Sequence, residues 1–96
     1  MAEMDPLQVM AEPNRRRILG LVWERELSAS EIADRFDSTF GAVSQHLAVL
    51  RDADLVVMRR DGNRRLYRTN RQALEAMWRE TLQRLAATID EETGHR

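Results

Sequence analysis

Residues 28–51 constrain the fold more than any other stretch, because they carry the pattern of two short helices joined by a tight turn. Ser28 and Glu31 stand at capping-box spacing, in which two side chains satisfy free amides at a helix N-terminus. Short polar residues then interrupt the apolar pattern, and the last of them, Thr39, is suited to cap a second helix. The sequence therefore predicts a helix-turn-helix over about residues 28–53.

The second helix of this pair has one apolar edge and an uncharged outer face. Val43, Leu47 and Leu50 recur at helical spacing and predict a stripe that holds the helix on the core. The outer face carries small or neutral polar residues, which can approach and hydrogen-bond base edges in a major groove. We expect DNA contact from Thr39, Phe40, Gly41, Ser44, Gln45 and His46. On these residues alone, an ordinary amphipathic helix with a bland outer face is an equal alternative.

Two members of this set have a second interpretation. Phe40 could meet a thymine methyl group or fold back on the turn. His46 lies beside the apolar stripe, so we expect it to pack with a hydrogen bond under the hairpin that follows rather than to bind a metal. No second histidine accompanies it nearby, and the sequence has no glycine-rich phosphate loop, so we do not expect an enzyme.

A basic hairpin is expected directly after the helix pair, over about residues 55–69. β-Branched residues favour a strand before Asp61-Gly62-Asn63, which accommodates the positive φ of a tight turn. Six arginines and one aspartate lie between Arg59 and Arg71, so positive charge gathers here although the net charge is -1. We expect phosphate contact from Arg60, Arg64 and Arg65. Phosphate would supply the counter-charge that the crowded arginines need, and a merely solvated hairpin is the alternative.

Two helix starts marked by proline precede the helix pair. Asp5-Pro6 and Glu12-Pro13 each place a capping residue before a proline at the first helical position. They predict a short helix over about residues 5–11 and another from Pro13 to about Glu24. Three consecutive arginines lie in the first turn of the latter. A solvated face or ion pairs between helices are expected for them, with phosphate contact as the alternative.

The last helix is predicted over about residues 70–90, after Thr69 and Gln72 at capping-box spacing. Its apolar stripe is wide, and a domain of 96 residues has little core left to receive it, which favours a homodimer. We expect the dimer interface to contain Leu7, Met10, Leu74, Met77, Trp78, Leu82, Leu85 and Ile89. A purely intramolecular core is the alternative.

Composition removes several classes of site. The sequence has no cysteine, which excludes disulfides, thiolate metal sites and cysteine nucleophiles within it. His95 and the acidic residues before it do not have the usual metal-site spacing, so neither a metal nor another cofactor is expected. The N-terminus is acidic and the longest apolar run is too short to cross a bilayer, so we expect a cytoplasmic protein without a membrane partner.

The chain resembles the ArsR (arsenic-repressor type) winged-helix transcription regulators over nearly its whole length. The likeness rests on residues 11–19, on the Val-Ser-x-His-Leu-x-x-Leu element of residues 43–50, and on the basic hairpin ending in Tyr67-Arg68. It implies a mainly α fold with a small β-hairpin wing, in one winged helix-turn-helix domain over residues 1–96. It also implies a homodimer, built from the first and last helices, that binds double-stranded DNA and represses transcription at an inverted-repeat operator.

The chain departs from the family pattern at three places. Asp37 and Asp54 stand where glycine is usual, so both are expected to need a left-handed backbone, which aspartate adopts at some cost. Ser38 replaces an apolar turn residue, which predicts a less anchored turn. The cysteine or histidine and carboxylate sets of metal-sensing members are absent, so we expect a repressor that is constitutive or released by an organic ligand or partner protein. The alternatives are a protein-protein adaptor and a metal-responsive repressor with histidine and carboxylate ligands.

Overall fold

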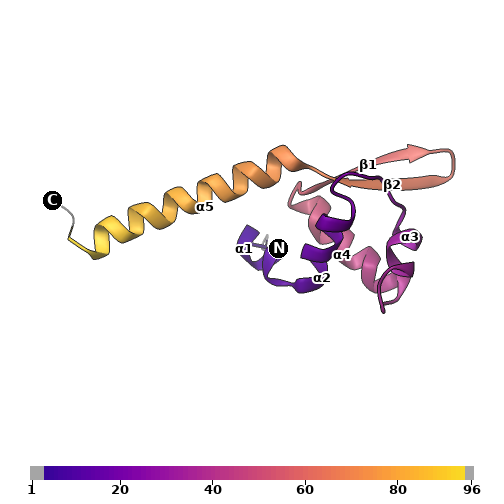
Figure 1. Ribbon diagram of the computed structural model, residues 1–96, viewed down its shortest axis with the longest axis horizontal. Coiled ribbons are helices and arrows are strands. Elements are labelled where there is room, and N and C mark those ends of the chain that lie inside the picture. Colours follow the sequence, from indigo (N-terminus) through magenta and orange to yellow (C-terminus); the bar gives the residue numbers. More distant parts are fainter. Residues whose placement is uncertain (1–3, 95–96) are drawn as a thin grey trace.

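The computed structural model describes residues 4–94, which form a mainly helical fold with one antiparallel hairpin (Figure 1). The elements in chain order are α1 (Pro6–Ala11), α2 (Pro13–Leu21), α3 (Ala29–Asp34), α4 (Phe40–Asp52), β1 (Val56–Asp61), β2 (Arg64–Thr69) and α5 (Arg71–Glu92). This order, a helix-turn-helix followed by a hairpin wing, is the predicted winged helix. No helix among the described residues is long and apolar enough to cross a membrane.

Local capping explains why α1 and α2 form as two separate helices. The Asp5 carboxylate accepts a hydrogen bond from the backbone N–H of Leu7 at 2.8 Å, and the Gln8 side chain accepts from the N–H of Asp5 at 2.9 Å. Glu12 caps α2 in the same way, by accepting from Asn14 N at 2.9 Å. Both predicted starts are confirmed.

The helix α2 ends at Leu21, earlier than the predicted Glu24. At Val22 the backbone has left the helical region, with φ -102° and ψ 22°. The carbonyl of this buried residue accepts a hydrogen bond from the N–H of Thr69 at 3.1 Å. The backbone turns here because its hydrogen bond goes to β2 instead of to another helical turn.

The three arginines of α2 bind neighbouring structure and form no ion pairs with other helices within residues 4–94. Arg15 is buried and donates from Nε to the carbonyl oxygen of Val9 at 2.7 Å. Arg16 donates to the carbonyl oxygen of Met10 at 2.6 Å. Arg17 lies over an aromatic ring of the α3–α4 turn, 4.3 Å from its centroid. The expectation of a solvated face holds for Arg16 and Arg17, which are exposed, and is wrong for Arg15, because the end of α1 offers free carbonyls within its reach.

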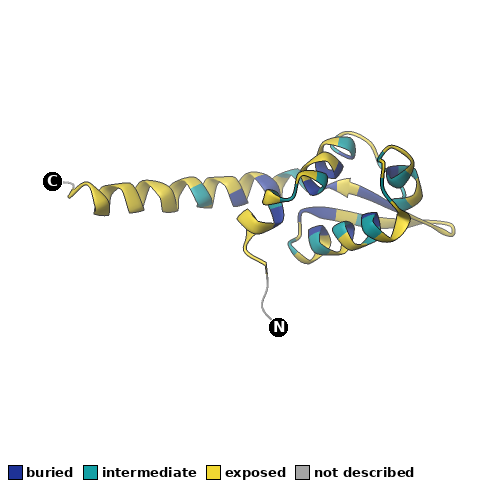
Figure 2. Cartoon of the chain, turned by 90° about the horizontal axis from the view of Figure 1, so that it is seen from below, coloured by how far each residue is buried: buried dark blue, intermediate teal, exposed yellow. Residues whose placement is uncertain are grey.

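The core lies where α2, α3 and α4 meet the base of the wing (Figure 2). The predicted stripe of α4, Val43, Leu47 and Leu50, is buried there as expected. The other members of the core cluster are Val9, Ile18, Leu19, Val22, Leu27, Ile32, Leu55, Val56, Tyr67, Leu74 and Met77. Burial of such a side chain contributes about 1.5–3 kcal/mol relative to exposure, so α4 is held firmly with its outer face free.

The wing is a regular two-stranded hairpin. Asp61 pairs with Arg64 across the turn, and Gly62 has φ +63°, which glycine adopts without cost. On the other side of β2, Leu27 and Tyr67 exchange two backbone hydrogen bonds of 3.2 and 2.8 Å. The segment between α2 and α3 therefore borders the wing and brings its side chains close to it.

The N-cap of α5 is Asn70, whose side chain accepts from the N–H of Ala73 at 3.2 Å. The predicted capping box of Thr69 and Gln72 is wrong. Thr69 belongs to β2, and its buried hydroxyl donates to the carbonyl oxygen of Leu19 at 2.7 Å, so it is not available as a cap. Residues 69–71 form what we call the β2–α5 junction.

The β2–α5 junction binds two further segments. The Asn70 amide donates from Nδ2 to the carbonyl oxygen of Asp54 at 3.1 Å, just beyond α4. The Arg71 guanidinium donates from Nε and Nη2 to the carbonyl oxygen of Trp23 at 3.2 and 2.7 Å. The same guanidinium lies 4.9 Å from the centroid of the Trp23 ring. The start of α5 is therefore bonded to the segments that directly follow α2 and α4.

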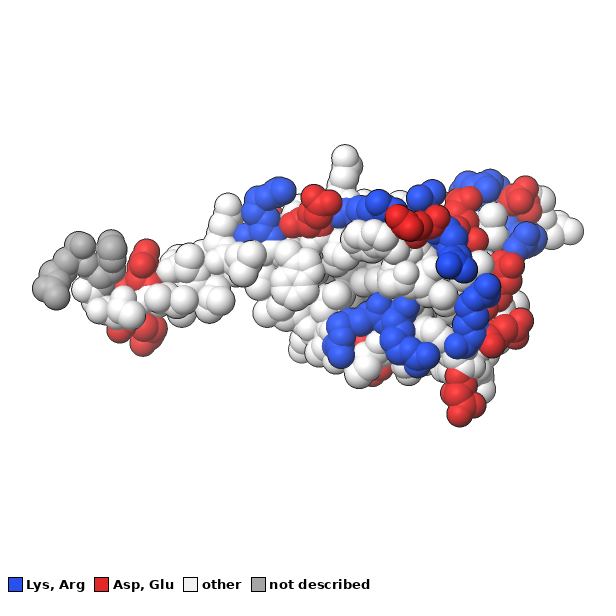
Figure 3. Space-filling view, in the orientation of Figure 1, with Lys and Arg blue, Asp and Glu red and all other residues white. Residues whose placement is uncertain are grey.

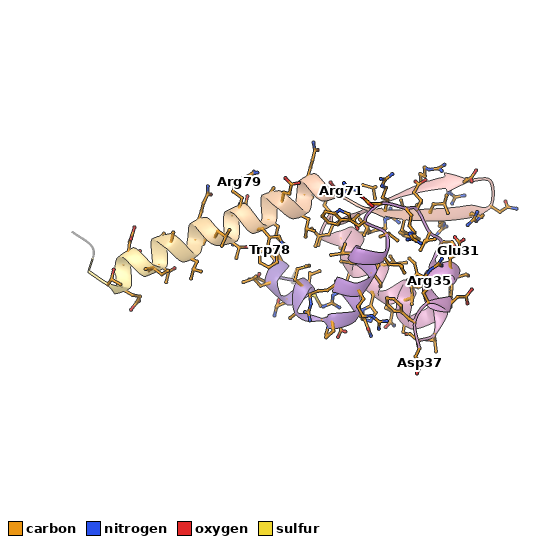
Figure 4. All side chains as sticks on the ribbon, viewed as in Figure 1. Glu31, Arg35, Asp37, Arg71, Trp78 and Arg79 are labelled. Atoms are coloured by element: carbon orange, nitrogen blue, oxygen red, sulfur yellow. The ribbon has the colours of Figure 1, made fainter. Side chains whose placement is uncertain are left out.

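Beyond its first turns, α5 projects from the body, which makes the molecule 58 Å long and only 27 by 23 Å across (Figures 1 and 2). Leu74 and Met77 are each 8% exposed and belong to the core of this chain, so they are largely lost from the expected dimer interface. The exposed apolar residues of the projecting part are Trp78, Leu82, Leu85 and Ile89. Figure 4 shows Trp78 on the side of α5 where α1 lies, with Arg79 on the opposite side.

The two aspartates that replace glycine behave differently. Asp54, after the end of α4, has φ +63° and is left-handed as expected. Asp37 is not among the residues with positive φ, so the corresponding expectation is wrong. The α3–α4 turn keeps a right-handed path because Phe36 N donates to the carbonyl oxygen of Ala33 at 3.1 Å, which continues the end of α3 as a tight turn.

Candidate nucleic-acid interface

The first turn of α4 presents its residues to solvent. Thr39 caps the helix by accepting from the N–H of Ala42 at 3.1 Å. Phe40 is 57% exposed and points outward rather than back on the turn. Gly41 and Gln45 are exposed as well, and Ser44 is half-buried. Most of the predicted outer face is therefore accessible to a partner.

A hollow of about 800 Å³ separates this face of α4 from the wing. Its α4 wall consists of Phe40, Ser44, Ala48 and Arg51, and its wing wall of Asn63, Arg64, Arg65 and Tyr67. The start of α3, from Ser28 to Ser30, closes one end. The fold thus places part of the predicted base-reading face, Phe40 and Ser44, along one hollow with two of the predicted phosphate-binding arginines, Arg64 and Arg65. Gln45 and Arg60 do not line it.

Arg60 and Arg65 are cross-strand partners on the wing and lie on the same face of the hairpin. Both are exposed, and neither guanidinium has a hydrogen bond or ion pair with any part of the chain that the structure describes. Like charges that face each other across a ladder repel. The pair is therefore a site that an anion would stabilise.

Two other wing arginines already have carboxylate partners. Arg59 donates from Nε and Nη2 to the two oxygens of Glu26, at 2.7 and 2.8 Å. Arg64 donates from Nη2 to Glu31 Oε1 at 2.5 Å. The expectation that phosphate is the counter-charge for the whole cluster is therefore wrong for these two. Figure 3 shows basic and acidic side chains interleaved along the wing.

The acidic partners are held in the charged state. The hydrogen bond from Arg59 is the main cause that lowers the pKa of Glu26 below its ordinary value. For Glu31 the main cause of a lowered pKa is the hydrogen bond from the backbone N–H of Ser28, assisted by the Ser28 hydroxyl and by Arg64. Both carboxylates are therefore ionised at neutral pH.

His46 is half-buried and has no hydrogen-bond partner within residues 4–94. The expected hydrogen bond under the wing is therefore wrong. No group of three or more histidine, aspartate or glutamate side chains in the described part of the chain is placed to hold a metal ion. His95, the other histidine, lies outside the described residues.

Sequence reasoning missed two residues that line the hollow and one contact made beside it. Arg51 joins it from the last turn of α4, and Tyr67 from the base of the wing. Glu31 was recognised only as a helix cap, whereas it also binds Arg64, 33 residues further along the chain. Helical periodicity from Ser44 through Ala48 could have indicated Arg51, but no local signal could have indicated the contact of Glu31.

Comparisons with known proteins agree with this architecture. A family model described as a helix-turn-helix domain matches residues 10–59. The arsenical resistance operon repressor of Staphylococcus xylosus is 33% identical over 69 residues, which make up 72% of this chain and 66% of the repressor. The regulator KmtR of Mycobacterium tuberculosis is 38% identical over 65 residues, 68% of this chain and 50% of KmtR. The chain thus spans less than two thirds of these two curated relatives.

A third relative matches over a longer stretch. The regulator Rv2034 of Mycobacterium tuberculosis is 35% identical over 92 residues, which cover 88% of this chain and 86% of the relative. Among solved structures, a "possible transcriptional regulator for arsenical resistance" has 40% identity and a TM-score of 0.75, covering 85% of this chain and 84% of the other. An ArsR-like transcriptional regulator from Rhodococcus sp. RHA1 has 27% identity and a TM-score of 0.76, covering 92% and 82%.

Proposed function

The chain belongs to the ArsR family of winged-helix transcriptional regulators, and on this premise we propose that it is a sequence-specific DNA-binding repressor that acts as a homodimer. The two subunits would occupy an operator of inverted symmetry and exclude polymerase. The relatives named for arsenical resistance suggest an inducible switch, but this sequence has no cysteine for a thiolate sensor. The proposed repressor, a cytoplasmic protein, is either constitutive or released by a signal other than thiolate-bound metal.

The observation that carries this proposal is that Ser44 of α4 and Arg65 of the wing line the same hollow. Gln45, the next residue of α4, is exposed, so the two α4 residues offer neutral hydrogen-bonding groups on an accessible helix face. Glutamine can bind adenine bidentately, and serine can bond to several bases. DNA-binding proteins divide their contacts between base reading and phosphate binding. The uncharged face of α4 suits the first task, and Arg60 and Arg65, whose side chains have no partner in the described structure, suit the second.

In the proposed complex, the N-terminal half of each α4 enters a major groove. Phe40, Gly41, Ser44 and Gln45 would meet base edges, while Arg60 and Arg65 would meet phosphates beside them. Dimerisation through the projecting part of α5 and the exposed side of α1 would place two α4 helices about one DNA turn apart. Trp78, Leu82, Leu85 and Ile89, with Leu7 and Met10 of α1, are the residues proposed for that interface.

A binding titration against ionic strength tests this function. Duplexes carrying inverted repeats from the region upstream of the gene would be compared with scrambled duplexes of equal length. We expect tighter binding to one inverted repeat, and a logarithmic affinity that falls with the logarithm of salt by about 0.9 per neutralised phosphate. Weak binding to every duplex, with an affinity that depends neither on sequence nor on salt concentration, would instead support a protein-protein adaptor.

A further inference from the structure

Two of the wing arginines are held by acids from the segment that precedes α4. Glu26 binds Arg59 through both carboxylate oxygens, and Glu31 binds Arg64 through one. These side chains are partly exposed, from 27% for Glu26 to 56% for Arg59. Such pairs are weak in water, so an incoming phosphate can compete for the same guanidinium groups.

Glu31 differs from Glu26 because its carboxylate has a second task. The same Oε1 atom that binds Arg64 also accepts a hydrogen bond from the backbone N–H of Ser28 at 2.9 Å. This bond belongs to the capping box of α3, which anchors the carboxylate at the closed end of the hollow. If Arg64 turned to a phosphate, Glu31 would stay behind and present an unpaired negative charge.

Figure 4 shows Glu31 on α3, on the side of that helix toward the wing. Arg64 and Ser28 both line the hollow, so the pair lies at the edge of the surface proposed for DNA. A carboxylate fixed at this edge competes with the phosphate backbone for the Arg64 guanidinium. The competition acts on any duplex, whatever its sequence.

We propose that Glu31 determines specificity by competing with DNA phosphate for Arg64 and so suppressing binding to duplexes that α4 does not recognise. The proposal rests on the function proposed above and concerns the regulation of the same surface. Random DNA is held almost wholly by phosphate contacts, so losing one arginine to an internal carboxylate weakens it most. An operator gains base contacts from α4, which offset the displacement of Glu31 by phosphate.

Replacing Glu31 by glutamine tests this role. Glutamine retains the capping-box acceptor at this position, so Glu31→Gln keeps the end of α3 while removing the charge. On a random 30-base-pair duplex, we expect Glu31→Gln to bind about two- to fivefold more tightly than the parent, the range of one exposed ion pair. The salt slope should steepen by about 0.9, because Arg64 becomes free to neutralise one more phosphate.

Two further variants separate the Arg64 contact from a general change in charge. Glu75→Gln removes an exposed charge on α5, away from the hollow, and should leave affinity and slope at the parental values. In Glu31→Gln/Arg64→Ala the gain over Arg64→Ala should vanish, because the competition acts through Arg64. A gain that persists in this double variant would overturn the proposal, since it would reflect net charge alone.

The outcomes also distinguish this inference from the proposed function. If the parent binds random duplex with a salt slope and Glu31→Gln has the same affinity and slope, the competition by Glu31 is refuted and DNA binding stands. If neither protein binds any duplex, the proposed function fails and this inference fails with it. Circular dichroism of each variant confirms that α3 and the rest of the fold persist.

Discussion

The guanidinium of Arg15 donates from Nε to the carbonyl oxygen of Val9 across 2.7 Å, and so joins α2 to the end of α1. A second bond of 3.1 Å runs from its Nη2 to the carbonyl oxygen of Gln8. The helix α1 has only six residues, too few to be stable alone, and its last carbonyls have no partner within the helix. Arg15 thus supplies hydrogen-bond donors to carbonyls at the end of α1 that have none within the helix.

Arg15→Met should therefore destabilise the fold. Methionine keeps the aliphatic bulk but leaves buried carbonyls without donors, which costs about 1–3 kcal/mol. Urea denaturation followed by circular dichroism measures this loss as a lower midpoint. Arg25→Met is the control, because Arg25 is exposed and has no hydrogen bond or ion pair with residues 4–94, so its midpoint should hardly move. Equal midpoints for the two variants would show that the bonds of Arg15 contribute nothing.

The left-handed backbone at Asp54 predicts a stabilising substitution. Asp54→Gly should raise the free energy of unfolding by up to about 1 kcal/mol, because glycine adopts φ +63° without the steric cost that aspartate incurs. The hydrogen bond from Asn70 is made to the backbone carbonyl of Asp54 and survives the change. Asp37→Gly is the matched comparison. It should give no gain, since φ there is not positive and glycine only adds entropy to the unfolded chain.

Base reading and phosphate contact should separate in two variants of the proposed interface. Gln45→Ala should weaken operator binding by about 1–3 kcal/mol and leave random DNA unaffected. Arg65→Ala should weaken both alike and lower the salt slope by about 0.9. We choose Arg65 rather than Arg64 because Arg65 has no carboxylate partner among the described residues. If Gln45→Ala reduced binding to both duplexes equally, the assignment of α4 to base reading would be wrong.

The projecting part of α5 predicts how the protein associates. Leu82 and Leu85 are 62% and 53% exposed, so Leu82→Glu/Leu85→Glu should leave the core of the chain unchanged. Charges in an apolar interface should convert the proposed dimer to monomers, which light scattering after size-exclusion chromatography detects as half the mass. Glu75→Gln, on the same helix, should remain dimeric. A parent that is already monomeric at high micromolar concentration would contradict the proposed assembly.

Stability should fall in acid partly through Glu26 and Glu31. Their pKa values in the folded state lie below the ordinary 4.5, so each contributes stability above that value and loses it as the pH falls further. Glu26→Gln should therefore flatten the decline of the unfolding free energy below pH 4.5 compared with the parent. Denaturant titrations at a series of acidic pH values measure this slope. A variant as acid-sensitive as the parent would rule out the Arg59 pair as a source.

Much of the fold could be predicted because its signals are local. The capping residues Asp5, Glu12, Ser28 and Thr39 each act within three residues, and all four cap where expected. The stripe of α4 is likewise a matter of spacing along one helix. Where a side chain had a distant partner, prediction failed. Thr69 looked like a cap, but its hydroxyl reaches Leu19, 50 residues earlier in the chain.

The charged residues of the candidate site were the hardest to interpret from sequence. A cluster of arginines predicts binding of an anion, yet a guanidinium can bind a carboxylate of the same chain as well as a phosphate of DNA. Which arginines remain free depends on how the loop before α3 lies along β2, and the backbone bridge of Leu27 and Tyr67 sets that position. Only the folded chain therefore distinguishes Arg65, which has no partner in the described structure, from Arg64.

The β2–α5 junction fixes the orientation of the projecting helix. Three different backbone carbonyls accept side-chain hydrogen bonds from Thr69, Asn70 and Arg71, which restrains rotation of α5 at its N-terminus. A displacement of the outer part of α5 would therefore be transmitted to the end of α4 and to the wing. In the proposed dimer, a change at the outer end of α5 would then alter the spacing of the two α4 helices, because each winged helix-turn-helix would move as a rigid body.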